Sequence, residues 1–217
     1  MPHHTPFTLA ADEVCIDHET DITAGELDVN DAYDLYLIAR GKPVREYKLV
    51  CFMNLQFFFQ DKNGKWTDLQ KQSFVNDWIA GVKSAWNRKL LRVLGNGVQV
   101  VLEFEFKTQV EGIWIFDHWE ISVQKTTSFE QSYVTPARGS SQLDSMDLVL
   151  TTKPRGRQRG VVHEFGHMIG LEDEYKPRTR WQHDGASVMN NGEIVRNRHI
   201  AHFVSWVNQK FRKHNIK

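Results

Sequence analysis

The sequence has little cysteine and no excess of charge of either sign. Only Cys15 and Cys51 occur in 217 residues, too few for a disulfide-built scaffold, and two free thiols are the expected state. The 27 basic side chains balance 27 acidic ones, so the formal net charge is zero. This balance argues against a protein that coats nucleic acid, and we expect no nucleic-acid partner.

Long apolar runs are also missing. The most apolar stretch, 49–59, contains Asn54 and Gln56 and is shorter than the roughly 18–20 residues of a membrane span. The N-terminal Met-Pro-His-His-Thr-Pro lacks the basic region and apolar core of a secretory signal. We therefore expect no membrane span, and either a cytoplasmic location or export by a specialised secretion system.

What remains is an ordinary globular composition, with 41% hydrophobic and 25% charged residues. Residues 1–45 are rich in Asp and Glu and have no clear periodicity, so we interpret them as an N-terminal arm laid over the rest, in which residues 31–40 form either a short helix or a strand. Residues 46–217 carry the periodic patterns and are predicted to form the main domain.

The patterns after residue 46 predict strands and helices in alternation. Apolar residues alternate in the strands, whereas in the first helix they recur at four-residue steps. Val110-Glu111-Gly112 predicts a hairpin between the second and third strands. Strands are predicted at 49–59, 98–106, 113–123 and 146–150, helices at 68–94, 158–170 and 199–212, and a loop at 126–144. This order indicates an α/β (α+β) fold.

One motif carries specific chemistry. His163, Glu164 and His167 form H-E-x-x-H within a predicted helix. Residues i and i+4 lie on one helix face, so both imidazoles can reach one metal ion. Glu164 can then touch a water on that metal and act as general base. The natural ion is Zn²⁺, which makes its bound water acidic near neutral pH.

The longer pattern H-E-x-x-H-x-x-G-x-x-D resembles the metzincin zinc peptidases. That resemblance implies a turn at Gly170, a third zinc ligand at Asp173 and a Met-turn at Met189. It also implies a twisted mixed sheet of about four to five strands with a long backing helix, an active-site helix and a C-terminal helix. Residues 146–150 would be the edge strand along which substrate lies.

The residues alone leave parts of the site open. Glu172, Glu174, His183 and Glu193 are alternatives to Asp173 as third ligand. Tyr175 and His199 are candidates to stabilise an oxyanion or contact substrate. The basic run Lys153, Arg155, Arg157 and Arg159 is either a solvated loop or a surface that faces substrate and prefers anionic groups.

These observations predict a zinc-dependent endopeptidase acting on a peptide or protein. Residues 158–205 also resemble metallopeptidase domains of bacterial toxins and effectors, which implies a delivery machine or a cognate inhibitor as further partners. Two alternatives stay open: an inactive metal-binding interaction module, and an amidase that cleaves cell-wall peptide.

Overall fold

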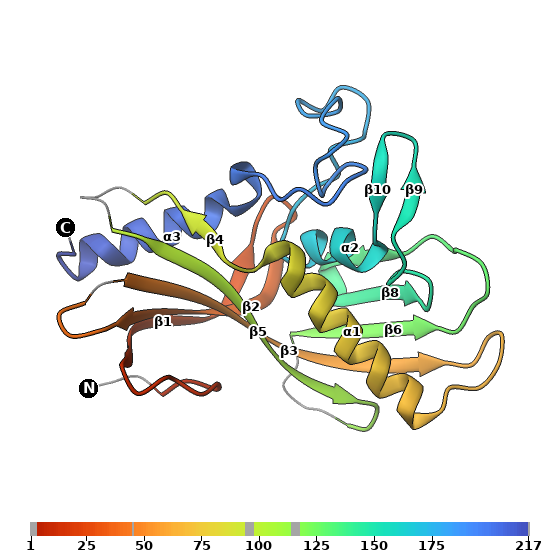
Figure 1. The fold of residues 1–217 in the computed structure, drawn as a ribbon, viewed down its shortest axis with the longest axis horizontal. Coiled ribbons are helices and arrows are strands. Elements are labelled where there is room, and N and C mark those ends of the chain that lie inside the picture. The colour runs from red at the N-terminus through yellow and green to blue at the C-terminus, as the bar shows by residue number, and fades with distance from the viewer. Residues whose placement is uncertain (1–3, 45, 94–97, 114–117, 217) are drawn as a thin grey trace.

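A computed structural model describes residues 4–44, 46–93, 98–113 and 118–216. The fold is mixed α+β, with a curled mixed sheet and three α-helices in these residues (Figure 1). The eight strands of the sheet are β1 (Glu13–Ala24), β2 (Val29–Arg40), β3 (Glu46–Gln60), β4 (Lys89–Leu91), β5 (Val100–Val110), β6 (Trp119–Gln124), β7 (Tyr133–Thr135) and β8 (Ser140–Asp144). A separate hairpin joins β9 (Thr151–Lys153) to β10 (Gly156–Gln158).

The long strand β3 organises the sheet. Its first half pairs antiparallel with β2, its second half pairs parallel with β6, and β5 runs parallel along its other edge. Beyond β6 lie β8 and the edge strand β7. The predicted alternation holds in β3, because Leu49, Cys51 and Met53 enter the main core while Val50 and Phe52 face a smaller cluster on the opposite side.

The three helices are α1 (Asp68–Trp86), α2 (Gly160–Met168) and α3 (Ala201–Lys213). Thr67 and Gln70 form a capping box that begins α1. Phe165 of α2 packs edge-on against Trp78 of α1 and Phe104 of β5. Phe104 in turn contacts Phe203 of α3, so all three helices share one aromatic core with the sheet.

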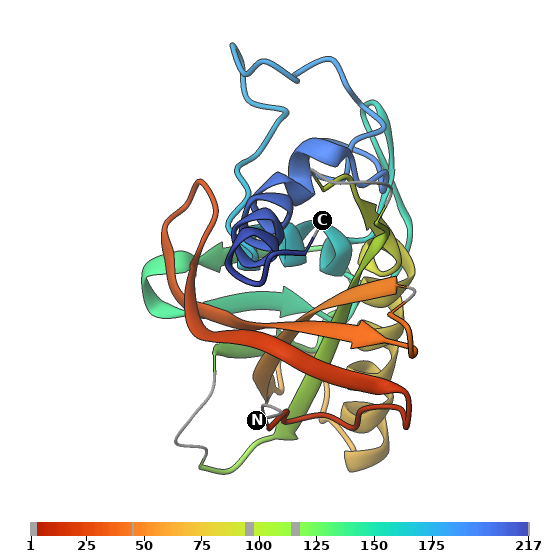
Figure 2. The ribbon, with the colours of Figure 1, turned by 90° about the vertical axis from the view of Figure 1, so that its left-hand side faces the viewer.

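The prediction of an arm at residues 1–45 is wrong for residues 13–40. They form β1 and β2, and β2 is hydrogen-bonded to β3. Tyr33 and Leu37 are fully buried in the main core. Figure 2 shows the β1–β2 hairpin curving upward beside α3. These two strands are one reason why the sheet exceeds the four to five strands predicted.

The first helix is shorter than the prediction of 68–94. Asn87 leaves the helix with extended backbone, and its side-chain carbonyl accepts a hydrogen bond from the Phe104 N–H at 2.8 Å. Arg88 has a positive φ of 58°, and the chain then reverses to pair β4 with β5. Leu94 lies outside the described residues.

The predicted hairpin between 98–106 and 113–123 is also wrong. β5 and β6 lie on opposite edges of β3, because Leu55 and Phe57 pair with both of them. Alternation fixes which face a strand buries but leaves its partner open. Residues 114–117 of the predicted third strand lie outside the described residues.

Residues 146–150 do not form the predicted edge strand. Asp144 ends β8, since its carboxylate accepts the Met146 N–H at 2.6 Å and the chain turns over 145–148. The predicted loop 126–144 instead supplies β7 and β8. No helix in the described part of the chain is long and apolar enough to cross a membrane.

Candidate metal centre

The helix α2 carries the H-E-x-x-H motif and ends in a glycine turn. Gly170 has a φ of 90°. Its N–H bonds to the His167 carbonyl at 2.9 Å, and the Leu171 N–H bonds to the Gly166 carbonyl at 3.0 Å. This pair of bonds is a Schellman motif, which reverses the chain after the helix. The reversal returns Asp173 to the face of α2 that carries both histidines.

His163, His167 and Asp173 bring one potential ligand atom each to a common point, with all three atoms within 4.8 Å of one another. Asp173 Oδ1 lies 3.2 Å from Nε2 of His163 and 3.2 Å from Nε2 of His167. Tetrahedral zinc with bonds of about 2.0–2.2 Å places neighbouring ligand atoms roughly 3.3 Å apart. The donor set suits a zinc ion, and the oxygen lies from each nitrogen at the spacing that such an ion requires.

Backbone carbonyls fix the orientation of both imidazoles. The Nδ1–H of His163 donates to the Val188 carbonyl at 2.9 Å, and that of His167 donates to the Leu171 carbonyl at 2.6 Å. With Nδ1 held in this way, Nε2 of each ring faces Asp173, and loss of the Nε2 proton would free a lone pair there for a metal ion. This is the arrangement that holds ligating histidines in metal sites.

Asp173 is ionised in this setting. Burial alone would raise the pKa of its carboxyl group, but hydrogen bonds with His163 and His167 hold that pKa well below its usual range. Its second oxygen accepts an ion pair from Lys176 at 3.2 Å. A carboxylate that stays charged near neutral pH is a competent metal ligand.

The alternative third ligands lie elsewhere. Glu174 is buried in an ion pair with Arg198, and Glu193 is paired with Arg159. Glu172 and His183 are exposed. None of these four belongs to the group of ligand atoms formed by the described residues around His163.

Glu164 is buried beside this group. It is 8% exposed, and its Oε2 has no hydrogen-bond partner in the described residues. Burial raises the pKa of Glu164, while the charges of His163 and His167 act in the opposite direction. An unpaired buried carboxylate oxygen costs free energy unless something else binds it, so this atom is placed for a water or substrate.

Met189 lies beneath α2, fully buried. A Cβ built on Gly166 would lie 2.1 Å from the sulfur of Met189, so the helix and this side chain meet only because residue 166 is glycine. The neighbouring Val188 supplies the carbonyl that orients His163. The segment around Met189 thus supports both the helix and one of its histidines.

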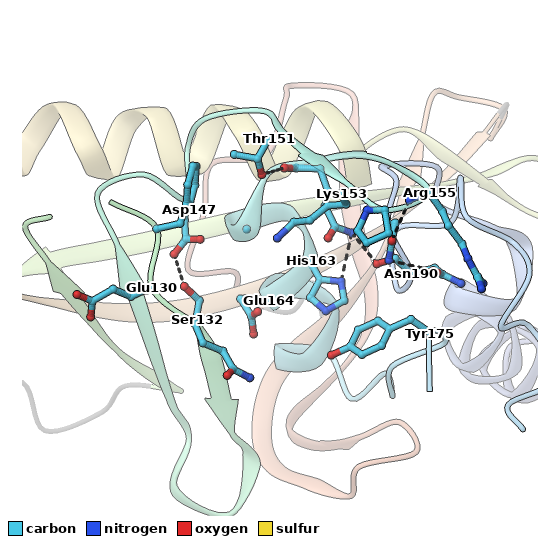
Figure 3. Close-up of a pocket in the computed structure, with 16 residues that line it drawn as sticks. Glu130, Ser132, Asp147, Thr151, Lys153, Arg155, His163, Glu164, Tyr175 and Asn190 are labelled. Atoms are coloured by element: carbon cyan, nitrogen blue, oxygen red, sulfur yellow. Dashed lines mark hydrogen bonds between the residues drawn. The ribbon is translucent and has the colours of Figure 1, made fainter. Parts of the chain in front are cut away.

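Tyr175 and His199 have different surroundings. The ring of Tyr175 stacks on His163 at 6.1 Å between centroids, and its hydroxyl points into the cleft (Figure 3). Burial and the charge of Asp173 raise the pKa of Tyr175 to about 12, so its hydroxyl remains a donor. His199 is instead held by Glu174 at 3.0 Å and by Ser187 at 3.3 Å, and it is not among the described residues that line the cleft.

A cleft of about 480 Å³ opens above His163 and Glu164. One wall carries Glu130 and Asp147, and the β9–β10 hairpin contributes Lys153 and Arg155 to the rim (Figure 3). The complete lining consists of Phe129, Glu130, Gln131, Ser132, Asp147, Thr151, Lys153, Pro154, Arg155, Gln158, Gly160, His163, Glu164, Tyr175, Asn190 and Asn191.

Sequence reasoning missed Asp147 and Gln158. A Cβ on Gly160, the first residue of α2, would lie 1.9 Å from a carboxylate oxygen of Asp147. The glycine at position 160 is thus the feature of the sequence that this contact requires. The amide of Gln158 is buried and donates to the carbonyls of Val188 and Gly192 at 2.8 and 2.9 Å. It ties the start of α2 to the segment around Met189.

A second group, Asp21, Asp34 and His118, also brings possible ligand atoms together. Here Nδ1 of His118 accepts the Asn54 N–H at 2.8 Å, so the ring proton sits on Nε2, the nitrogen that faces Asp34 at 3.4 Å. Asp34 also accepts the Asp21 N–H at 3.0 Å. These atoms already satisfy one another, and the histidine has no lone pair left for a metal.

No protein-family model matches the chain, and no curated protein matches it.

Proposed function

We propose that this protein is a zinc-dependent peptidase of the metzincin type. The observation that supports this best is the meeting of His163, His167 and Asp173 beside a buried Glu164 whose Oε2 has no partner in the described residues. A purely structural zinc site takes four protein ligands and has no use for such a carboxylate. Two imidazoles and one carboxylate leave a fourth position for water or substrate.

Each residue has a defined task in this proposal. His163 and His167 would bind zinc through Nε2, and Asp173 through Oδ1. The bound ion would acidify a water and polarise the scissile carbonyl. Glu164 Oε2 would accept the proton of the attacking water and return it to the leaving amine. Its raised pKa suits a group that must hold a proton briefly.

Tyr175 would stabilise the oxyanion that develops on the substrate carbonyl. Its hydroxyl remains protonated because its pKa is raised to about 12, and it points into the same cleft as Glu164 (Figure 3). A hydroxyl donor beside the developing negative charge stabilises it. Tyr175→Phe is expected to lower kcat about 10²-fold with unchanged zinc content.

The test is bound zinc by elemental mass spectrometry, with cleavage of unfolded casein scored on the same samples. We expect one zinc per chain in wild type and in Glu164→Ala, and loss of cleavage only in the latter. Asp173→Ala should lose most of its zinc, whereas Glu172→Ala, an exposed neighbour of the ligand, should keep both zinc and activity.

Other outcomes overturn the proposal in distinct ways. Zinc bound by wild type without hydrolysis of any peptide would indicate an interaction module. Release of cell-wall peptide without casein cleavage would indicate an amidase. Absence of zinc from wild type, even after exposure to zinc salts, would refute the metal centre itself.

A further inference from the structure

The basic run before α2 divides into side chains with different surroundings. Arg159 is bound to Glu193 by a two-pronged ion pair of 2.7 and 2.9 Å. Arg157 is exposed on β10 and does not line the cleft. Lys153 and Arg155 do line it, on the hairpin that overhangs His163. Only two of the four cations therefore face the place where a substrate would lie.

These two cations have no carboxylate partner among the residues that the structure describes. Arg155 donates to the main-chain carbonyl of Gln182, and Lys153 points toward Glu164 from the rim (Figure 3). Other cations near the site are already paired, Lys176 with Asp173 and Arg198 with Glu174.

The acidic side chains of the opposite wall are compensated within the protein. Glu130 forms an ion pair with Lys62 at 2.6 Å. Asp147 is 5% exposed and accepts hydrogen bonds from the Ser132 hydroxyl and, at 2.8 Å, from the Asp144 N–H. Apart from Glu164 on the floor of the cleft, which Lys153 faces, and the hydrogen-bonded Asp147, the charges of this lining without an ion-pair partner in the described residues are the two cations of the hairpin.

We propose that Lys153 and Arg155 bind an acidic side chain of the peptide substrate close to the scissile bond. This specificity rests on the proposed peptidase function. Two exposed ion pairs acting together favour a carboxylate over its amide by roughly two- to thirtyfold, with about fivefold as the middle value. Because both cations are exposed, the preference falls as ionic strength rises.

Binding is measured first, on zinc-loaded Glu164→Gln, with a fluorescent hexaglutamate peptide and the matching hexaglutamine peptide. We expect the hexaglutamate to bind about fivefold more tightly at 50 mM salt. Lys153→Gln combined with Arg155→Gln should bring the ratio close to one. Arg157→Gln, on the same hairpin but outside the cleft, is the matched control and should keep most of the preference.

Cleavage is scored separately by mapping the bonds that wild type hydrolyses in unfolded casein. Enrichment of Asp and Glu near those bonds, lost in the Lys153/Arg155 double variant, is the expected result. Equal binding of the two peptides, or an equal loss from Arg157→Gln, would overturn the anionic subsite whether or not casein is cleaved. Selective binding without any cleavage would instead count against the peptidase and leave the subsite standing.

Discussion

Replacing Gly170 by alanine is expected to lower the free energy of unfolding by about 2–6 kcal/mol. The residue has a φ of 90°, which a side chain adopts at a cost of about 1–3 kcal/mol. An added Cβ would also lie 2.2 Å from the Ala24 carbonyl oxygen. Relief of that overlap requires backbone movement, and overpacking of this kind costs about 1–3 kcal/mol more.

Gly25 and Gly170 lie against each other, so a side chain added at either position should have a similar effect. A Cβ on Gly25 would lie 2.3 Å from the Gly170 carbonyl oxygen. That oxygen also accepts the N–H groups of Glu26 and Leu27 at 2.7 and 3.1 Å. Gly25→Ala should therefore destabilise the protein similarly, and the double variant should lose less than the sum because both substitutions separate the same two turns.

Urea unfolding of the metal-free protein measures these effects, with Gly64→Ala as control. Gly64 has a φ of 112°, but nothing lies within 4 Å of the position that an added Cβ would occupy, so its alanine variant reports backbone strain alone. We expect Gly170→Ala to lose at least 1 kcal/mol more than Gly64→Ala, from the overlap described above. Equal losses would refute the idea that the β1–β2 hairpin and the turn after α2 are in obligatory contact.

Three further predictions concern titration and reactivity. Burial lowers the pKa of His202 to about 4, so below about pH 6.5 the unfolded chain binds a proton at this residue and the folded chain does not. The free energy of unfolding should therefore fall by about 3 kcal/mol between pH 7 and pH 4, and urea unfolding of His202→Gln across this range should lack that part of the loss. Cys15 and Cys51 are free and buried, and burial raises the pKa of Cys15 to about 11. A thiol reagent should therefore label neither cysteine in the folded protein and both in denaturant, and rapid labelling of the folded protein would contradict this. Burial alone would lower the pKa of His167, but Asp173 raises it, so zinc binding should release protons and should weaken as pH falls. Calorimetry in buffers of different ionisation enthalpy measures the proton release, and zinc binding without it would contradict this prediction.

The candidate metal centre could be predicted from the sequence because its three ligands lie close together along the chain. Helical spacing places His163 beside His167, and a glycine turn returns Asp173 within three residues. The walls of the cleft could be predicted only in part. Asp147 lies in a segment that was predicted to be an edge strand, and the sequence left open whether Lys153 faces solvent or substrate. Only the packing of the β9–β10 hairpin and of the turn after β8 against α2 brings both residues to His163.

For the fold, too, the features set by local sequence could be predicted and those set by distant contacts could not. The mixed α+β class and the alternation in β3 were predicted correctly. Residues 31–40 could not be assigned to a helix or to a strand of the sheet because Tyr33 to Ile38 is buried on both faces, which removes the alternation that identifies a half-exposed strand. The partners of β5 and β6 depend on contacts across the sheet that no local pattern encodes.

The hydrogen bonds from the β1–β2 turn to Gly170 bear on how such an enzyme could be switched on. Proteolytic removal of a propeptide leaves a folded enzyme only if the remaining domain can form its hydrophobic core without the removed segment. Release of residues 1–44 would strip β2 from one edge of β3, uncover the core that Tyr33 and Leu37 fill, and free the turn that precedes Asp173. Removal of this segment is therefore expected to unsettle the turn that positions Asp173 rather than to uncover a finished site.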